Sequence, residues 1–374
     1  MKKIIKRIVI GIIAAIGLVI IFIGGFIAVL TAAEYRPANI EEVELRYSAD
    51  NAPQFSDADR PPAVPALARL ARNQPFSILS WNIGYASLDE SQDFIMDGGR
   101  GVRPADSANV RRNLGGIGGF LSGAGCDIAL LQEVDAASRR SYYVDQTADL
   151  ARRLSGTSAF AANFRCIFVP VPFPEFIGRV SSGLLTLNSF ETGQALRISL
   201  PSPFSWPVRA ANLKRCLLVS RMPIAGTGAE LVLVNLHLEA YDTSGGREAQ
   251  TKALLDFLYS EYAKGNYCIA GGDFNQNFPG IDAERFAVKN SAFFVPGTLN
   301  PGLLDPGWRF AADTQTPTSR LLNEPYSGRP DETQLYIIDG FIISPNVELI
   351  GTRTFDMGFK YSDHHPVKLE VSLQ

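Results

Sequence analysis

Hydrophobic and polar positions divide the chain into a long apolar start, a proline-rich stretch and a region of short apolar runs. From residue 75 onward these runs are short and rich in β-branched residues, as in buried strands. They cover residues 76–84, 127–135, 165–171, 182–189, 216–224, 230–240, 267–275, 335–344 and 364–371. Helical periodicity covers only residues 107–125 and 247–266, and Gly265 is a suitable stop for the second helix. Many strands with few helices predict sheets packed together with helices outside them.

The N-terminal segment carries no charge from Ile8 to Ala33. At about 1.5 Å per residue it is long enough to cross a hydrocarbon layer of roughly 30 Å. An uncleaved anchor is favoured over a signal peptide, whose apolar region is shorter, although Thr31 and Ala33 form a weak small-x-small cleavage site. Four basic residues precede the span, and the positive-inside rule then predicts a single-pass protein of the cell membrane with a cytoplasmic N-terminus and an extracytoplasmic C-terminal domain; they are Lys2, Lys3, Lys6 and Arg7.

Three regions follow from this pattern. Residues 1–33 form the basic start and transmembrane anchor, residues 34–74 an extended linker, and residues 75–374 one folded domain. The linker contains five prolines and little periodicity, with one short helix expected at residues 64–73.

Composition excludes some classes of protein. The formal net charge of −3 gives no global basic footprint, which disfavours a protein that coats nucleic acid. The four cysteines lie in apolar runs and are expected to be small buried hydrophobic residues, with a Cys166–Cys216 disulfide left open. No cysteine or histidine spacing indicates a zinc site.

The chemistry of the chain is expected where the apolar runs end. Polar side chains stand at these ends: Asn82, Glu133, His237, Asp273, Asn275, Asp339, Asp363 and His364. Each taken alone is more typical of a turn, a helix cap or a packed histidine. Together at one sheet edge they would form an oxygen-rich hollow suited to Mg²⁺, with Mn²⁺ or Ca²⁺ as alternatives. Such a set serves phosphoester hydrolysis, which needs a hard cation, a base for water and donors for the phosphate.

Six motifs in order resemble the endonuclease/exonuclease/phosphatase superfamily, which includes DNase I and the neutral sphingomyelinases. They are "SWNIG", "LLQEVD", "NLHLEA", "GGDFN", "IDGFIIS" and "SDHHPV". The resemblance covers residues 75–374. It implies an α/β fold: a four-layered sandwich of two mostly antiparallel sheets flanked by helices, preceded here by one transmembrane helix.

The resemblance also implies roles for the polar residues. Asn82, Glu133 and Asp363 match the metal site, with Glu133 as the principal carboxylate. The catalytic positions are matched by His237, Asp273, Asn275, Asp339 and His364. Asp273 would orient the attacking water or a second metal ion, Asn275 would hold phosphate, and Asp339 would bind the imidazole of His364. The adjacent His365 is expected to point away from His364 and to serve packing or the surface.

The substrate is less well defined than the reaction. The leading hypothesis is a metal-dependent phosphodiester hydrolase whose substrate is a lipid headgroup, an envelope component or nucleic acid. An extracellular nuclease would need basic and aromatic groups near the site, and the candidates are Arg139, Arg140, Tyr142, Tyr143, Lys214 and Arg215. A sphingomyelinase-like enzyme could use an apolar lip within residues 168–177, which could equally be core. A non-catalytic module that binds a phosphorylated ligand is a further alternative, and no protein partner is inferred beyond the bilayer itself.

Overall fold

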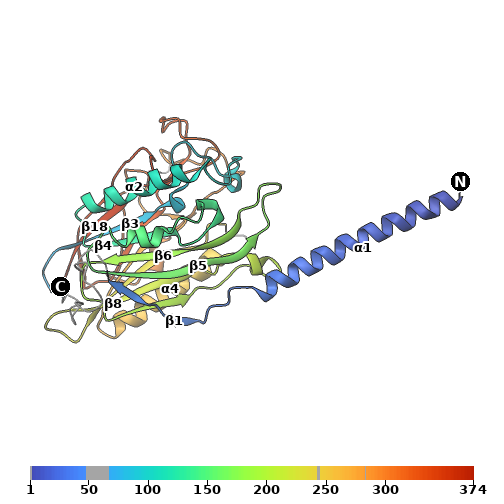
Figure 1. Ribbon diagram of the computed structural model, residues 1–374. Helices are drawn as coiled ribbons and strands as arrows, with labels where there is room; N and C mark the ends of the chain where they lie inside the picture. Colours follow the sequence, from blue (N-terminus) through green and yellow to red (C-terminus); the bar gives the residue numbers. More distant parts are fainter. Residues whose placement is uncertain (1, 48–66, 242–244, 283) are drawn as a thin grey trace, which may run out of the picture.

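Two seven-stranded sheets packed face to face form the body of the protein (Figure 1). The computed structural model describes residues 2–47, 67–241, 245–282 and 284–374. Each sheet contains one parallel pair among antiparallel neighbours, and helices cover the outer faces. This is the predicted four-layered sandwich.

The first sheet has the order β17-β18-β3-β4-β6-β5-β2. Its strands are β2 (Leu45–Tyr47), β3 (Phe76–Asn82), β4 (Ile128–Asp135), β5 (Thr157–Val169), β6 (Gly178–Asn188), β17 (Val347–Thr354) and β18 (Val367–Leu373).

The second sheet has the order β1-β7-β8-β9-β10-β16-β13. Its strands are β1 (Ile40–Glu42), β7 (Gln194–Ser199), β8 (Cys216–Pro223), β9 (Glu230–His237), β10 (Tyr267–Asp273), β13 (Arg309–Ala311) and β16 (Asp339–Ile343). Two short ladders lie outside the sheets: β11 (Gln276–Asn277) with β12 (Gly297–Thr298), and β14 (Ser319–Arg320) with β15 (Leu335–Tyr336).

The helices include the two that periodicity predicted. The α-helices are α1 (Lys2–Ala32), α2 (Ser107–Gly123), α3 (Gln146–Leu150) and α4 (Gly246–Ala263), and the 3₁₀ turns are η2 (Gly84–Ala86), η3 (Ile95–Asp97), η4 (Arg139–Ser141), η5 (Val208–Ala211) and η6 (Pro301–Leu303). The Asp106 side chain caps α2 by accepting a bond from the Asn109 amide. Gly265 follows α4 with φ +87°, the left-handed conformation that ends many helices.

Each parallel pair is joined by one of the long helices. The chain runs β3–α2–β4 in the first sheet and β9–α4–β10 in the second. A parallel connection requires such a crossover, and it places the carboxyl ends of both strands at the same edge. The polar residues that end these four strands therefore meet at one edge of the sandwich.

Three apolar layers hold the sandwich together. Side chains such as Ile128 and Phe341 fill the space between the sheets. On the outer faces, α2 packs residues such as Ile117 against the first sheet, and α4 packs residues such as Leu254 against the second. All four cysteines are buried and free, so the disulfide left open is absent from the structure.

The segment predicted to be an extended linker contributes strands to both sheets. Residues 40–47 supply β1 and β2, which pair with β7 and β5 and so add an edge strand to each sheet. The expected helix at 64–73 is wrong within its described part, since Ala68 and Leu70 form bridges to Phe190 and Ile224. Residues 64–66 lie outside the described part. Leu70 is buried between the sheets, and this tertiary contact overrides the local helical pattern.

The N-terminal helix α1 projects away from the sandwich (Figure 1). Over its described length it is long and apolar enough to cross a membrane, with a mean hydropathy of 3.0 in its most apolar window. Leu30 is its one buried residue, and it packs on the domain.

Candidate active site

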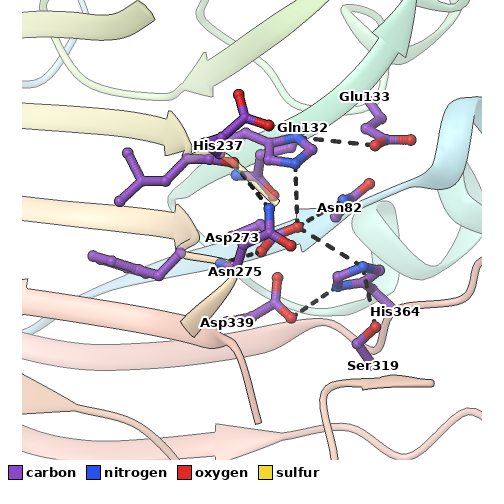
Figure 2. Close-up of polar contacts among 12 residues, drawn as sticks. Asn82, Gln132, Glu133, His237, Asp273, Asn275, Ser319, Asp339 and His364 are labelled. Carbon is purple, nitrogen blue, oxygen red and sulfur yellow. Dashed lines mark hydrogen bonds and ion pairs between the residues drawn. The ribbon is translucent and has the colours of Figure 1, made fainter. Parts of the chain in front are cut away.

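The eight predicted site residues come together at the edge where the four parallel strands end. Asn82 and Glu133 come from β3 and β4, and His237 and Asp273 from β9 and β10. The remaining residues stand on the adjoining segments: Asn275 just after β10, Asp339 at the start of β16, and Asp363 and His364 before β18. Figure 2 shows Asn82, His237 and His364 around Asp273, with Asp339 beside His364.

Local backbone irregularity aims several of these side chains. Glu133 has φ +55° and lies where the β4–β6 register shifts, between Leu131 and Val134. Such a bulge redirects a side chain that regular alternation would send elsewhere. Gly84 has φ +49°, and a Cβ there would lie 2.7 Å from Asp363 Oδ1, so a larger residue would displace this carboxylate.

Asp339 and His364 form a close side-chain pair. The His364 Nδ1 lies 2.8 Å from Asp339 Oδ2, and both side chains are buried. Because a carboxylate only accepts, Nδ1 carries the proton, and Nε2 faces Ser319 Oγ at 3.2 Å and Asp273 Oδ2 at 3.8 Å.

Asp273 occupies the centre of the site (Figure 2). Its Oδ2 accepts a hydrogen bond from Asn82 Nδ2 at 3.1 Å and lies 3.4 Å from His237 Nε2. Its Oδ1 accepts from the Asn275 amide at 2.8 Å. Burial, followed by the charge of Asp339, raises the pKa of Asp273 to about 7. This carboxyl therefore gains and loses a proton near neutral pH, as a general base requires.

The two imidazoles have opposite affinities for a proton. Burial, and then the positive Arg215, lower the pKa of His237 well below its usual value. Burial also opposes charge on His364, but Asp339 and the other carboxylates prevail and raise its pKa well above the usual value. One site thus holds a neutral imidazole and an imidazolium on either side of Asp273.

Glu133 and Asp363 form the acidic side of the site. The Glu133 side chain is 27% exposed and lies 4.0 Å from His237 Nδ1, whereas Asp363 is buried. Burial is the main cause that raises the pKa of Asp363 to about 6, and the negative charge of Glu133 adds to this effect. A buried carboxyl whose ionisation is opposed by a neighbouring carboxylate is a place where a cation would relieve the repulsion.

The residues fit a hard divalent cation. Carboxylate and amide oxygens are its preferred ligands, and Glu133, Asp363 and Asn82 supply them. In the described part of the chain, Asp339 Oδ1 is also buried without a hydrogen-bond partner. A second grouping, Asp273, Asp339 and His364, has ligand atoms within 4.8 Å of one another. Because the Nδ1 of His364 is bonded to Asp339, its Nε2, 3.8 Å from Asp273 Oδ2, is the ring nitrogen left to serve as a ligand in this grouping.

Asn275 and His365 each stand close in sequence to a residue at the centre of the site, Asp273 and His364 respectively. The Asn275 Nδ2 donates to the Leu238 carbonyl at 2.9 Å, so one of its amide hydrogens serves the backbone. His365 is 1% exposed and stacks on the Phe359 ring, with centroids 3.9 Å apart. Its Nε2 accepts from the Phe359 amide and its Nδ1 donates to the Pro317 carbonyl, which is the packing role expected for it.

Three features near the site were not found from the sequence. Ser319 contacts His364 across 45 positions, and no local motif marks it. Gln132 and Asn235 join β4 to β9 under the site through a 2.9 Å hydrogen bond. Both stand in recognised motifs, immediately before Glu133 and two residues before His237, which was the available signal. Tyr85 stacks under the Arg140 guanidinium at 3.7 Å and forms a buried wall beside the acidic residues.

The cations proposed for nucleic-acid binding are engaged elsewhere. Arg140 pairs with Asp135 at 3.0 Å, and Lys214 with Glu34 at 3.1 Å. The Arg215 guanidinium is buried beside Glu239 and the His237 carbonyl. These three cations therefore take part in internal ion pairs.

Comparisons with known proteins agree with the geometry. The profile of the endonuclease/exonuclease/phosphatase family matches residues 79–364, which is more than half of the chain. No curated protein sequence matches.

Two solved structures with the same fold come from bacteria. An endonuclease/exonuclease/phosphatase from Beutenbergia cavernae DSM 12333 is 18% identical, with a TM-score of 0.53 over 80% of this chain and 72% of the other. The endonuclease/exonuclease/phosphatase from Bacteroides vulgatus is 15% identical, with a TM-score of 0.50 over 81% of this chain and all of the other. With the family profile, the ordered motifs and the shared sandwich, the chain belongs to the endonuclease/exonuclease/phosphatase family.

Proposed function

We propose that this protein is a divalent-metal-dependent phosphodiester hydrolase, anchored by α1 in the cell membrane with its site outside. The observation that carries the proposal is the position of Asp273 between two imidazoles of opposite proton affinity and beside an acidic pair. Family membership supports the reaction class, and the apolar helix supports membrane association.

The residues divide the chemistry among them. Asp273 Oδ2, oriented by Asn82, takes a proton from the attacking water, whose oxygen forms a bond to phosphorus as the bond to the leaving oxygen breaks. Asp339 keeps His364 charged, and the charged ring holds a phosphoryl oxygen. In the expected activation of water by a histidine and an aspartate, Asp273 is therefore the base and His364 is not. Neutral His237 can offer one hydrogen bond to the phosphoryl group.

The cation would be held by Glu133, Asp363 and Asn82, with Mg²⁺ as the first choice. When bound, it supplies neutralisation of charge on a phosphoryl oxygen. The identity of the ion is part of the proposal and is decided by activity with Mg²⁺, Mn²⁺ and Ca²⁺ in turn.

The alternatives have less support. For a nuclease, three of the cations proposed to bind the polyanion are engaged in internal ion pairs. A non-catalytic binding module would not need every site position filled, yet all eight residues are present and assembled.

The test uses the purified full chain in detergent with each metal or a chelator. Its substrates are bis-(p-nitrophenyl) phosphate, plasmid DNA, sphingomyelin and phosphatidylinositol, with His364→Ala as the control. Metal-dependent turnover that is lost in His364→Ala supports the hydrolase. Activity that persists in the chelator or in His364→Ala would contradict it.

The orientation is tested separately. A protease added to intact cells or spheroplasts should remove the C-terminal domain. Protection until the membrane is permeabilised would contradict an extracytoplasmic site.

A further inference from the structure

We infer that the catalytic domain rests one defined apolar surface on the bilayer that α1 enters, and that its substrate phosphoester belongs to a lipid headgroup of that bilayer. The assignment of a lipid substrate rests on the proposed function, whereas the assignment of a bilayer-facing surface does not. The surface, here called the collar, surrounds the C-terminal end of α1 and consists of Ile167, Val171, Phe173, Trp206 and Val208.

Ion pairs and a hydrogen bond join the end of α1 to the domain. Glu34, directly after α1, has a side chain that is 2% exposed and pairs with Arg36, Arg209 and Lys214 at 2.9–3.1 Å. Trp206 Nε1 donates to Thr31 Oγ1 in the last turn of the helix at 3.1 Å. These contacts, with Leu30 packed on the domain, hold the end of α1 against the domain, so the two are not joined by a free tether.

A chain of aromatic contacts connects the helix to the tip of the β5–β6 hairpin. Phe26 on α1 meets Phe168 with ring centroids 6.0 Å apart, Phe168 meets Phe176 at 5.3 Å, and Phe176 meets Phe173 at 6.0 Å. The apolar lip considered from the sequence therefore has two parts. Ile177 is core and Phe168 is half-buried, while Phe173 lies outside.

The outer part of the collar has no partner in the described chain that would cover it. Phe173 is 85% exposed, more than any other large apolar side chain of the described residues. Trp206 and Val208 are more than half exposed on the other side of α1, and aromatic residues favour the membrane interface. Arg165 and Arg179 are exposed on the same hairpin and suit anionic headgroups. Because the collar is continuous with a helix of membrane-spanning length, a bilayer is the occupant that fits it.

Strand register places the active site toward the same end of the sandwich. Ser182 of β6 pairs with Asp135 on one side and with Phe164 on the other, two residues beyond Glu133. β5 then continues for five residues to Val169, about 17 Å at 3.3–3.4 Å per residue. The hairpin tip thus extends past the site in the direction in which β3 and β4 end. When the hairpin tip contacts the bilayer, the site faces the lipid headgroups. The distance between the site and the bilayer is then long enough for one headgroup to lie between them.

The surface is tested by fluorescence, which does not depend on activity. Trp81 and Trp308 are 1% and 7% exposed, whereas Trp206 is 58% exposed, so Trp206→Phe removes the one exposed tryptophan of the three. In that background, Phe173→Trp places a reporter at the tip, and Ile350→Trp on β17, at the far edge of the same sheet, is the matched control. The full chain is reconstituted in vesicles with or without brominated acyl chains.

We expect bromine to quench at least half of the emission added by Phe173→Trp and little of that added by Ile350→Trp. Equal quenching of the two reporters, or none, would overturn the collar as a bilayer-facing surface.

The substrate is tested with Phe173→Asp, a change outside the catalytic set. Turnover of sphingomyelin or phosphatidylinositol in the vesicles that hold the enzyme should fall at least tenfold, while turnover of water-soluble bis-(p-nitrophenyl) phosphate stays unchanged. Equal turnover of the lipids by parent and variant, or cleavage of DNA with neither lipid, would overturn the headgroup assignment. If the parent cleaves nothing, the proposed function fails, and quenching of the Phe173→Trp reporter still decides the surface.

Discussion

His364 and His365 are neighbours in the chain but occupy opposite environments. His364 faces three carboxylates, of Asp273, Asp339 and Asp363, within 4 Å of its ring nitrogens. His365 lies against a carbonyl, an amide and the Phe359 ring, and its one acidic contact, Asp356, is 68% exposed. Burial alone therefore does not distinguish the histidine proposed for catalysis from its packed neighbour. The charges that surround the ring decide whether it carries a proton or fills a core.

The largest effect should come from the carboxylate that partners the first histidine. Asp339→Asn removes the charge that keeps His364 protonated, and kcat/KM for bis-(p-nitrophenyl) phosphate should fall by about 10²–10⁴. Asp356→Asn is the matched control beside His365, because it removes an exposed charge 3.4 Å from that ring. Equal losses of kcat/KM in the two variants would contradict the different roles assigned to the two histidines.

A change on the acidic side should separate metal binding from proton transfer. Glu133→Gln keeps the shape of the side chain but removes its charge, so the Mg²⁺ concentration for half-maximal activity should rise roughly tenfold or more. Metal titration of the rate measures this shift. A titration like that of the parent would move the cation to Asp273, Asp339 and His364, the second grouping.

The second histidine should matter for stability instead. His365→Leu leaves the Phe359 amide and the Pro317 carbonyl without partners in a buried place, at a cost of about 1–3 kcal/mol each. Urea denaturation should show a loss of that order in the free energy of unfolding. Turnover per folded molecule should stay within a few-fold of the parent, and a collapse of turnover would give His365 a catalytic role.

The smallest effect concerns pH, and its sign differs between the two rings. The folded pKa of His365 lies below its usual 6.5, mainly through burial, so its contribution to stability is present above pH 6.5 and is lost as pH falls. The folded pKa of His364 lies above its usual 6.5, through the charge of Asp339, so its contribution is fully present below pH 6.5 and is lost as pH rises from there through the raised folded pKa. Unfolding free energies of the parent, His364→Asn and His365→Asn, measured in a chelator across this range, should show the two slopes. Slopes of one sign for both would refute the assignment.

The sequence predicted elements whose signals are local. The apolar runs, the two long helices and the polar residues at strand ends all appear in the structure, because burial on both faces leaves a continuous apolar run. The edge strands β1 and β2 were missed because their pairing with β7 and β5 depends on distant partners. The same holds at the site, where Ser319 reaches His364 only through an isolated bridge between distant segments.

Charge pairing was the hardest property to predict. Lys214, a candidate for binding a polyanion, pairs with Glu34, 180 positions earlier, just after α1. Sequence spacing carries no information on such a contact. The ion pair forms because the fold brings Lys214, which lies between η5 and β8, next to the C-terminal end of α1.

The central claim is tested most directly by comparing His364→Asn with His365→Asn in one assay. Both variants remove an imidazole from adjacent positions, and kcat/KM for bis-(p-nitrophenyl) phosphate is measured with saturating Mg²⁺ and corrected for folded protein. A fall of about 10²–10⁴ in His364→Asn with a change of only a few-fold in His365→Asn is the predicted result. Near-parental turnover in His364→Asn, or an equal fall in both, would contradict it.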